Sequence, residues 1–326
     1  HQSRALSDTR RRFRVSMRVV QSGMLSLLQD SGRYSQHRLG LSNGGPMDRE
    51  AFHYCNRLLQ NSPASTTIEI SVGGLQLESL VDTYICLTGA PMPLSINGQE
   101  KSLWAVQRVY AGDIIQIGFA RSGCRSYFGV ADGFTIKARF GSTATVVREN
   151  IGGLRGHSLQ VGDQLPCPTT TERKQYYLAD RDQPRYQSTL TVRVIPGYQQ
   201  RHFNRVEQRR FFGSTYKISG RCDRMGYRLE GPVIKCDIEG VLSEGICFGA
   251  IQLPPDGQPI VLLNDRQTIG GYPKIGAALS LDAARMTQLV PGSSVHFAPI
   301  TRNTAHKALQ LAQRFTLRKP LQERRQ

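Results

Sequence analysis

Residues 260–274 read IVLLNDRQTIGGYPK, and the rest of the chain is organised around this stretch. The apolar run 260–263 is typical of a buried strand. An acid, a base, an amide and a hydroxyl follow in 265–268, and a glycine pair then favours a tight turn and close approach by a ligand. Because loops at strand ends commonly carry binding residues, the stretch predicts a strand with a binding loop. A glycine-rich turn with solvated charges is the alternative interpretation.

A second stretch, residues 223–231, reads DRMGYRLEG and repeats the order acid, base, glycine, tyrosine, base. Arginine binds a carboxylate or phosphate through two parallel hydrogen bonds, and a neighbouring acid can orient it. Two such loops in one half of the chain suggest a shared site for an anionic group. A pair of structural Asp–Arg bridges would explain the same pattern.

Length and composition favour a β-rich protein. The 326 residues suffice for one large or two ordinary domains, and the apolar content of 39% supports a normal core. The 32 glycines and many short aliphatic runs favour strands joined by tight turns. Residues 97–98, Asn-Gly, predict a two-residue hairpin. No apolar run approaches the length of a membrane span.

The net charge of +17 is concentrated at the two ends of the chain. Residues 1–18 carry +5 and residues 302–326 carry +6, which leaves +6 for residues 19–301. Basic ends without an aromatic–basic stripe are typical of solvated tails, so we expect no nucleic-acid partner. A modestly basic body suits a small anionic substrate.

The cysteines and histidines show no metal-binding or disulfide pattern. Seven cysteines are scattered without a Cys-x-x-Cys pair, and the seven histidines lack zinc-site spacing. The cysteines are typical of reduced thiols in a cytoplasmic protein. We therefore predict no metal site built from these residues and a cytoplasmic location. A phosphate-binding P-loop is also absent from the sequence.

The order of patterns predicts two β-rich subdomains and a few short helices. A helix is expected over 46–60, behind two glycines, and an amphipathic tail helix near 304–317. The expected divisions are a disordered or vestigial leader (1–16), an N-terminal β subdomain (17–170), a linker (171–188), a C-terminal β-barrel subdomain (189–301) and a basic, helical tail (302–326).

Several ordered motifs together resemble the family of the 5-oxoprolinase C subunit, also known as allophanate hydrolase subunit 2 or the biotin-dependent carboxyltransferase A/B family. The resemblance covers about residues 17–300. Its motifs are QDSGR (29–33), GGPMD (44–48) with Asn56-Arg57, Arg148 with Gly152-Gly153, residues 223–231, GAIQ (249–252) with PDG (255–257), and residues 265–274.

This resemblance implies a carboxyltransferase-A-like first subdomain and a cyclophilin-like second barrel. It also implies a hetero-oligomer with a B subunit that is similar to allophanate hydrolase subunit 1, and a further partner, the A subunit. In such a system the B and C subunits use ATP and Mg²⁺ to phosphorylate 5-oxoproline, and the A subunit opens the ring to glutamate. The expected substrate class is a small amide or lactam, and ATP is expected at the interface between subunits.

The resemblance also implies roles for named residues. Stabilising charge on an activated amide requires cations and hydrogen-bond donors. Candidate catalytic residues are Asp223, Arg224, Arg228, Asp265, Arg266 and Lys274. Candidate substrate-binding residues are Gln252, Gln267, Thr268, Gly270, Gly271, Tyr272, Asp30, Arg33 and Asp48. Three roles are open to Asp223 and Asp265: orienting arginines, holding Mg²⁺, or purely structural pairing. Alanine at Arg224 or Arg266 is predicted to abolish activity and leave the fold intact.

Two other functions remain open from the sequence. The first is a carboxyltransferase subunit that moves a carboxyl group from biotin to urea or a related amide. The chain has no Met-Lys-Met biotinylation motif, so biotin would be carried by another chain. The second is a non-catalytic regulator of a kinase inhibitor. Convergence of loops 223–231 and 265–274 on a cleft would favour an enzyme, whereas solvent-facing loops without a pocket would favour the regulator.

Overall fold

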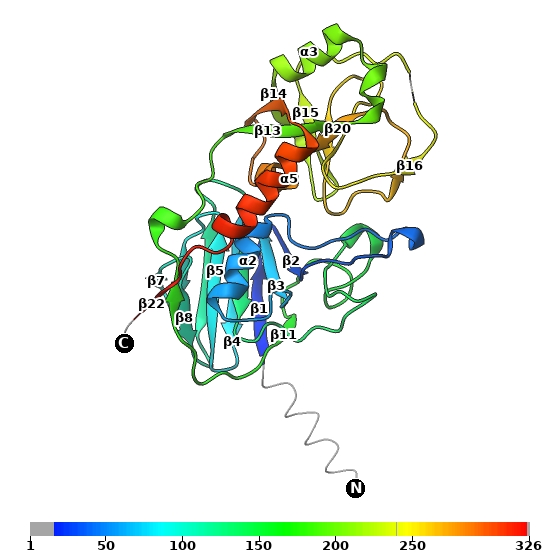
Figure 1. Ribbon diagram of the computed structural model, residues 1–326. Helices are drawn as coiled ribbons and strands as arrows, with labels where there is room; N and C mark the ends of the chain where they lie inside the picture. Colours follow the sequence, from blue (N-terminus) through cyan, green and yellow to red (C-terminus); the bar gives the residue numbers. More distant parts are fainter. Residues whose placement is uncertain (1–15, 239, 325–326) are drawn as a thin grey trace. The chain divides into compact units, whose positions relative to one another are not determined.

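The computed structural model describes residues 16–238 and 240–324, which form two compact units (Figure 1). Neither unit is continuous in the sequence. Of the described residues, unit 1 contains 16–33, 49–185 and 319–324, whereas unit 2 contains 34–48, 186–238 and 240–318. The prediction of a mainly β protein with a few short helices is confirmed. Of the predicted leader, 1–15 lie outside the described residues and Ser16 begins the first strand.

Unit 1 is built from two antiparallel sheets and a small strand pair. The six-stranded sheet has the order β11 (Gln164–Pro166), β1 (Ser16–Ser22), β4 (Gly73–Ser79), β9 (Ile114–Phe119), β6 (Leu94–Ile96), β7 (Gln99–Lys101). The five-stranded sheet has the order β2 (Leu25–Gln29), β3 (Thr67–Ser71), β10 (Arg125–Val130), β5 (Thr83–Gly89), β8 (Val106–Val109). The predicted two-residue hairpin at 97–98 joins β6 to β7.

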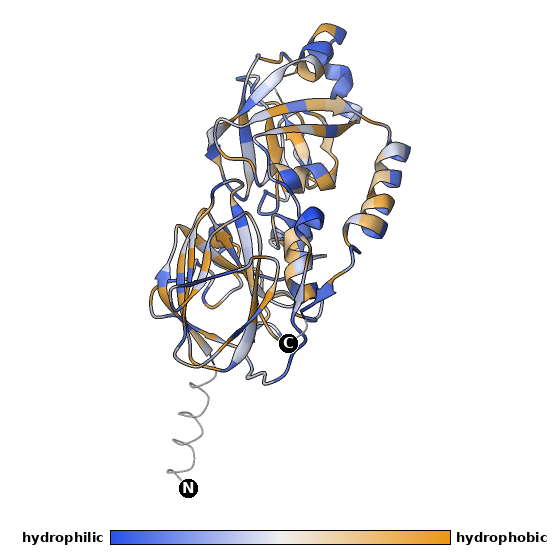
Figure 2. Cartoon of the chain, turned by 90° about the vertical axis from the view of Figure 1, so that its left-hand side faces the viewer, coloured by the Kyte–Doolittle hydropathy of each residue, from blue (hydrophilic) through white to orange (hydrophobic). Residues whose placement is uncertain are grey.

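The core of unit 1 lies between these sheets. Alternate residues along a strand point to opposite faces, and the buried cluster draws on both sheets, for example Leu77 on β4 and Phe128 on β10. A second cluster covers the outer face of the five-stranded sheet with the helix α2 (Arg49–Leu58). Figure 2 shows apolar residues along the strands of each unit. Burial of these apolar faces is the main driving force for the layered arrangement.

The C-terminal segment returns to unit 1. Its strand β22 (Gln322–Glu323) pairs with β12 (Tyr176–Tyr177). The carbonyl of Lys319 accepts a hydrogen bond from Arg57 on α2 at 2.6 Å, and the backbone N–H of Lys319 donates to Tyr54 at 3.2 Å. The predicted tail therefore divides into the helix α5 (Arg302–Leu311), a π-helical turn (Ala312–Thr316) and this strand.

Unit 2 is a closed seven-stranded barrel. Its strands close in the order β13 (Thr189–Pro196), β20 (Lys274–Ala278), β17 (Ala250–Gln252), β18 (Ile260–Leu262), β15 (Gly226–Glu230), β14 (Thr215–Cys222), β21 (Ser294–Pro299). The pairing of β13 with β21 is parallel and the other pairings are antiparallel. The strand predicted from the apolar run 260–263 is therefore β18.

Further short elements surround the barrel. The strands β16 (Glu244–Gly245) and β19 (Ile269–Gly270) pair with each other. A 3₁₀ helix, η4 (Tyr198–His202), precedes the helix α3 (Arg205–Gly213), and α4 (Ser280–Met286) follows β20. The remaining 3₁₀ turns are η1 (His37–Leu39), η2 (Val147–Glu149) and η3 (Asp180–Asp182).

The helix predicted over 46–60 is shorter than expected, because α2 begins only at Arg49. The preceding residues belong to unit 2, where Met47 is fully buried in the barrel core. Gly44 and Gly45 have φ values of 60° and 83°, a conformation that glycine adopts without steric cost. The glycine pair therefore turns the chain into the barrel, and Pro46 does not start the helix.

All seven cysteines are free, and Cys55, Cys86 and Cys167 are buried. Burial raises the pKa of the Cys167 thiol to about 12, because the thiolate is disfavoured away from water. Among the described residues, no helix has the length and apolar character that crossing a bilayer requires.

Candidate functional site

The loop after β18 carries a buried ion pair. Asp265 accepts two hydrogen bonds from Arg224, at 2.8 Å from Nε and 3.0 Å from Nη2. Both residues are about 95% buried, at 6% exposure for Arg224 and 5% for Asp265. The backbone N–H of Asp265 also donates to the Arg224 carbonyl at 2.9 Å. The two predicted loops, 223–231 and 265–274, therefore meet through this pair.

The same loop holds the segment 42–48 against the barrel. The side-chain amide of Asn264 lies 3.0 Å from each of the carbonyl oxygens of Gly44, Gly45 and Pro46. Arg224 donates to the Gly45 carbonyl at 2.8 Å. We call the residues Arg224, Asn264, Asp265 and Arg266, with the segment 42–48, the clamp.

Arg266 is also part of the clamp rather than an exposed cation. It donates to the carbonyls of Ile246 and Leu263, each at 3.1 Å, and to the side chain of Asn43 at 3.2 Å. Its own carbonyl accepts from Ser42 at 2.9 Å. A buried arginine with several donors already used is well suited to fixing a loop. The contacts of the clamp explain how segment 42–48 is positioned.

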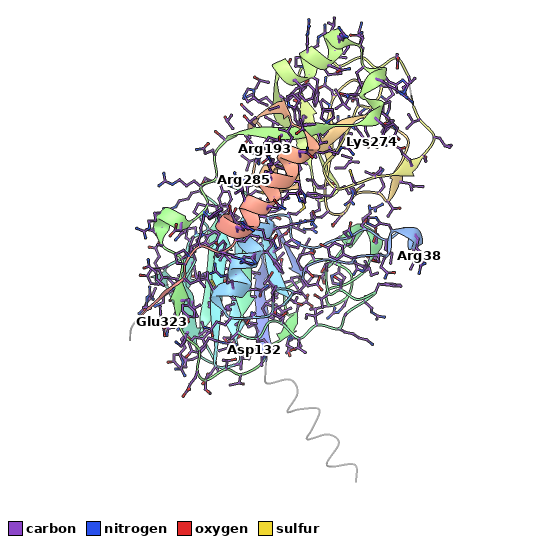
Figure 3. All side chains as sticks on the ribbon, in the orientation of Figure 1. Arg38, Asp132, Arg193, Lys274, Arg285 and Glu323 are labelled. Carbon is purple, nitrogen blue, oxygen red and sulfur yellow. The ribbon has the colours of Figure 1, made fainter. Side chains whose placement is uncertain are left out.

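Lys274, which is labelled in Figure 3, lies at the start of β20 and belongs to a second polar cluster. Lys274 forms an ion pair with Glu244, and the Lys274 side chain is only 13% exposed. Glu244 also accepts from the hydroxyl of Tyr198 and from Nε2 of Gln199, the latter at 2.8 Å. Oε1 of Gln199 accepts from the backbone N–H of Lys274 at 2.8 Å. We call Tyr198, Gln199, Glu244, Gln252 and Lys274 the lysine cluster.

Gln252 places a buried amide beside this lysine. It lies directly opposite Lys274 in the β17–β20 pair, so both side chains share one face of the sheet. Gln252 is 4% exposed. An ammonium and an amide from paired residues on neighbouring strands can together bind a carbonyl or carboxylate oxygen.

The protonation states in the lysine cluster follow from its contacts. The Lys274 ammonium, followed by the Tyr198 hydroxyl, lowers the pKa of the Glu244 carboxyl. The hydrogen bond to Glu244 in turn raises the pKa of the Tyr198 hydroxyl. Both shifts favour a carboxylate that accepts hydrogen bonds from a neutral tyrosine and a cation.

The glycine pair 270–271 does not adopt a left-handed backbone conformation. Neither glycine has a positive φ, so a left-handed turn does not explain them. Gly270 lies on β19 opposite Glu244, and a Cβ at Gly270 would lie 2.5 Å from Cδ1 of Ile246 and 3.0 Å from Nε2 of Gln252. Gly270 therefore leaves room for the amide of Gln252.

The other predicted site residues of loops 223–231 and 265–274 belong neither to the clamp nor to the lysine cluster. Asp223 accepts from the backbone N–H groups of Met225 and Gly226, at 2.8 and 3.1 Å, and so stabilises a turn. Arg228 pairs with Asp256 at 2.7 Å. Gln267 and Tyr272 are exposed and Thr268 is half-buried. The catalytic or binding roles of all these residues stay predictions.

Three predicted substrate-binding residues are buried and hydrogen-bonded. Asp48 accepts from Tyr186 at 2.9 Å and from Gln288 at 2.7 Å within unit 2. Asp30 and Arg33 belong to unit 1. Asp30 accepts from Ser142 at 2.5 Å and from the backbone N–H of Thr143 at 2.8 Å. Arg33 is fully buried and donates to the carbonyls of Arg139 and Ala144, each at 3.1 Å.

The described residues contain no group of three or more His, Cys, Asp and Glu side chains able to hold a metal ion. Mg²⁺ bound to a nucleotide takes carboxylates together with phosphate oxygens and water. A complete carboxylate-rich Mg²⁺ site therefore does not arise from the described part of this chain alone.

Four residues of the clamp and the lysine cluster were missed from the sequence: Tyr198, Gln199, Glu244 and Asn264. Glu244 lies in the polar stretch Ser243-Glu244-Gly245, which is a weak signal by itself. Asn264 directly precedes the stretch 265–274 and would have been found by extending it one residue. Tyr198 and Gln199 follow the Pro196-Gly197 strand end, where polar residues have no distinctive spacing.

Comparisons with known proteins agree on one family. The model of the carboxyltransferase domain, subdomain A and B, matches residues 39–299. The chain is 32% identical over 309 residues to the C subunit of 5-oxoprolinase from Escherichia coli strain K12, covering 92% of this chain and 96% of that protein. It is 26% identical over 307 residues to urea amidolyase of Saccharomyces cerevisiae, covering 88% of this chain but 17% of that protein.

The fold is also shared with a solved structure. The crystal structure of the K. lactis urea amidolyase matches with a TM-score of 0.87 and 23% sequence identity. The match covers 94% of this chain and 20% of that chain. At this identity the likeness concerns the fold.

Proposed function

This chain belongs to the carboxyltransferase family defined by subdomains A and B, and from that premise we propose that it is the C subunit of an ATP-dependent 5-oxoprolinase. With a B subunit it would take part in phosphorylating 5-oxoproline before the ring is opened to glutamate. The observation that carries this proposal is the nearly full-length match to the C subunit of a 5-oxoprolinase, 96% of that protein. The match to urea amidolyase covers only 17% of that longer protein.

The lysine cluster supports this reaction class. When a lactam carbonyl is activated, negative charge develops on its oxygen, and a cation with a fixed hydrogen-bond donor stabilises that charge. Lys274 offers the cation and Gln252 offers the donor, on neighbouring strands. We propose these two side chains as the carbonyl-binding pair, in place of the arginines of the clamp.

In this proposal, ATP binding requires the B subunit. We propose that the nucleotide and Mg²⁺ bind at the interface between the B subunit and this chain, and we assign no step of the reaction to them. The role of this chain is to bind and polarise the small amide.

Carboxyl transfer from biotin to urea or a related amide is the second candidate. The name of the family and the similarity to urea amidolyase favour it. Both reactions require a site that binds a small amide oxygen, so the lysine cluster suits either one. Substrate tests are therefore needed to separate them.

The deciding test is an ATPase assay of the chain purified together with a candidate for the B subunit, a pair that we call the B–C complex. We expect ATP turnover that 5-oxoproline stimulates, and no turnover by the isolated chain. Stimulation by urea with bicarbonate, or carboxyl transfer from a biotin derivative, would replace the proposal with the second candidate. A complex that forms but responds to neither substrate would contradict both enzyme functions.

Gly270→Ala tests the location of the site. The added methyl group would crowd Gln252 and Ile246, so we expect the KM for 5-oxoproline to rise about tenfold, equivalent to ~1.4 kcal/mol of binding. Gly245→Ala is the matched control, because a Cβ there meets no atom within 4 Å. Equal kinetics of the two variants in the complex would place the substrate elsewhere.

A further inference from the structure

The carboxylate of Glu244 is the centre of the lysine cluster. Three groups converge on it: the Lys274 ammonium, the Tyr198 hydroxyl, and Nε2 of Gln199 at 2.8 Å. Nε2 of Gln199 also lies 3.0 Å from the Tyr198 oxygen. Because Gln199 accepts from the backbone of Lys274 as well, a single amide ties the strand that carries the lysine to the carboxylate that pairs with it.

The backbone around Glu244 keeps this arrangement in register. Glu244 on β16 lies opposite Gly270 on β19, and Gly270 lies against Gln252. Gln252 is in turn the cross-strand neighbour of Lys274. The carboxylate and the glycine therefore face each other across the β16–β19 pair, and the amide and the lysine across the β17–β20 pair.

Lysine needs such support to act from a defined position. Its ammonium is a point charge on a flexible four-carbon stem, and Glu244 is its ion-pair partner within the described residues. The side chains of Lys274 and Glu244 are 13% and 32% exposed, so solvent screens this half-buried pair less than it screens a fully exposed ion pair. The pair therefore restricts the positions that the ammonium can take.

We propose that Glu244 is a positioning residue that directs the Lys274 ammonium toward the amide of Gln252, and that Tyr198 and Gln199 hold Glu244 in place. This inference rests on the proposed function. Glu244 itself contacts the lysine rather than the reacting carbonyl. Its contribution to the reaction should therefore depend on the presence of Lys274.

A double-mutant cycle on the B–C complex tests this dependence. In the wild-type background, Glu244→Gln should lower kcat/KM for 5-oxoproline by about 100-fold, the scale of loss when a catalytic group is misplaced by about 1 Å. In a Lys274→Met background the same substitution should have almost no further effect. Tyr198→Phe, at a position 65% exposed to solvent, should cause a smaller loss that also disappears in that background.

Each outcome of the cycle has a defined meaning. If the fold-losses in kcat/KM of Glu244→Gln and Lys274→Met multiply in the double variant, the positioning role is overturned and the proposed function is unaffected. Unchanged kinetics of both Glu244→Gln and Tyr198→Phe would have the same meaning. A wild-type complex that does not respond to 5-oxoproline would overturn the proposed function, and the role of Glu244 with it. Glu100→Gln and Tyr110→Phe on unit 1 are the matched controls, and melting curves verify folding. If Glu244→Gln does not fold, the cycle that combines Tyr198→Phe with Lys274→Met tests the positioning role instead.

Discussion

Replacing Arg224 with alanine should lower the free energy of unfolding by about 3–5 kcal/mol, the usual cost of removing one partner from a buried ion pair. Asp265, at 5% exposure, would lose the two hydrogen bonds that Arg224 donates to it. The Gly45 carbonyl would lose a donor as well. Urea unfolding, followed by circular dichroism, measures this change directly.

The chain provides a matched control for this experiment. Arg228 pairs with Asp256 on the same barrel, but the two side chains are 28% and 50% exposed. Removing an exposed ion pair costs about 0–1 kcal/mol, so Arg228→Ala should leave the unfolding curve nearly unchanged. Similar losses for Arg224→Ala and Arg228→Ala would mean that the clamp contributes little to stability.

This expectation differs from the one based on sequence alone. The motif 223–231 predicts that Arg224→Ala abolishes activity and leaves the fold intact. The buried contacts of Arg224 predict instead that the main effect of this substitution is a large loss of stability. An Arg224→Ala/Asp265→Ala double variant should be less destabilised than the sum of the two single variants, because it leaves no buried charge alone. An additive result would indicate that the two residues act independently.

Lys274→Met should lower kcat/KM for 5-oxoproline by about 10²–10³-fold, the range observed when one group that stabilises a developing oxyanion is removed. Methionine keeps most of the apolar stem of lysine but not its charge. Glu244 would retain Tyr198 and Gln199 as hydrogen-bond donors, so we expect the melting temperature to change little. Substrate-stimulated ATP turnover by the B–C complex is the measurement.

Lys217→Met is the control for this variant. Lys217 lies on β14 of the same barrel, is exposed, and donates to Ser294 at 2.7 Å. Its removal should leave turnover unchanged. Near-normal kcat/KM in Lys274→Met would show that the ammonium does not assist the reaction, and the carbonyl-binding role would then have to be assigned to other residues.

The sequence predicts best those features that depend on neighbouring residues. The apolar run 260–263 forms β18, and the Asn-Gly pair at 97–98 joins two strands. Both follow from local periodicity and turn chemistry. The stretch 265–274 also contains Lys274, which the structure places in the lysine cluster.

Features that depend on barrel closure could not be predicted in this way. Tyr198 follows β13, which pairs with the lysine-bearing β20, and Glu244 lies on β16, which pairs with β19 just before Lys274. No short-range pattern specifies that register. The sequence also left open whether Asp–Arg pairs are structural, and the pair that forms, Arg224 with Asp265, joins two loops 41 residues apart.

The discontinuous make-up of the two units has a consequence for synthesis on the ribosome. The barrel contains the segment 34–48, including Met47, in addition to residues 186–318. The segment 34–48 can therefore pack in the barrel only after residues 186–318 have been synthesised. Unit 1 is completed by β22, close to the C-terminus. Closing such long loops has an entropic cost that is met only once distant contacts form. Neither unit can therefore finish folding before its late segments have emerged, and nascent chains should depend on protection from aggregation until residues 186–318 and β22 are available.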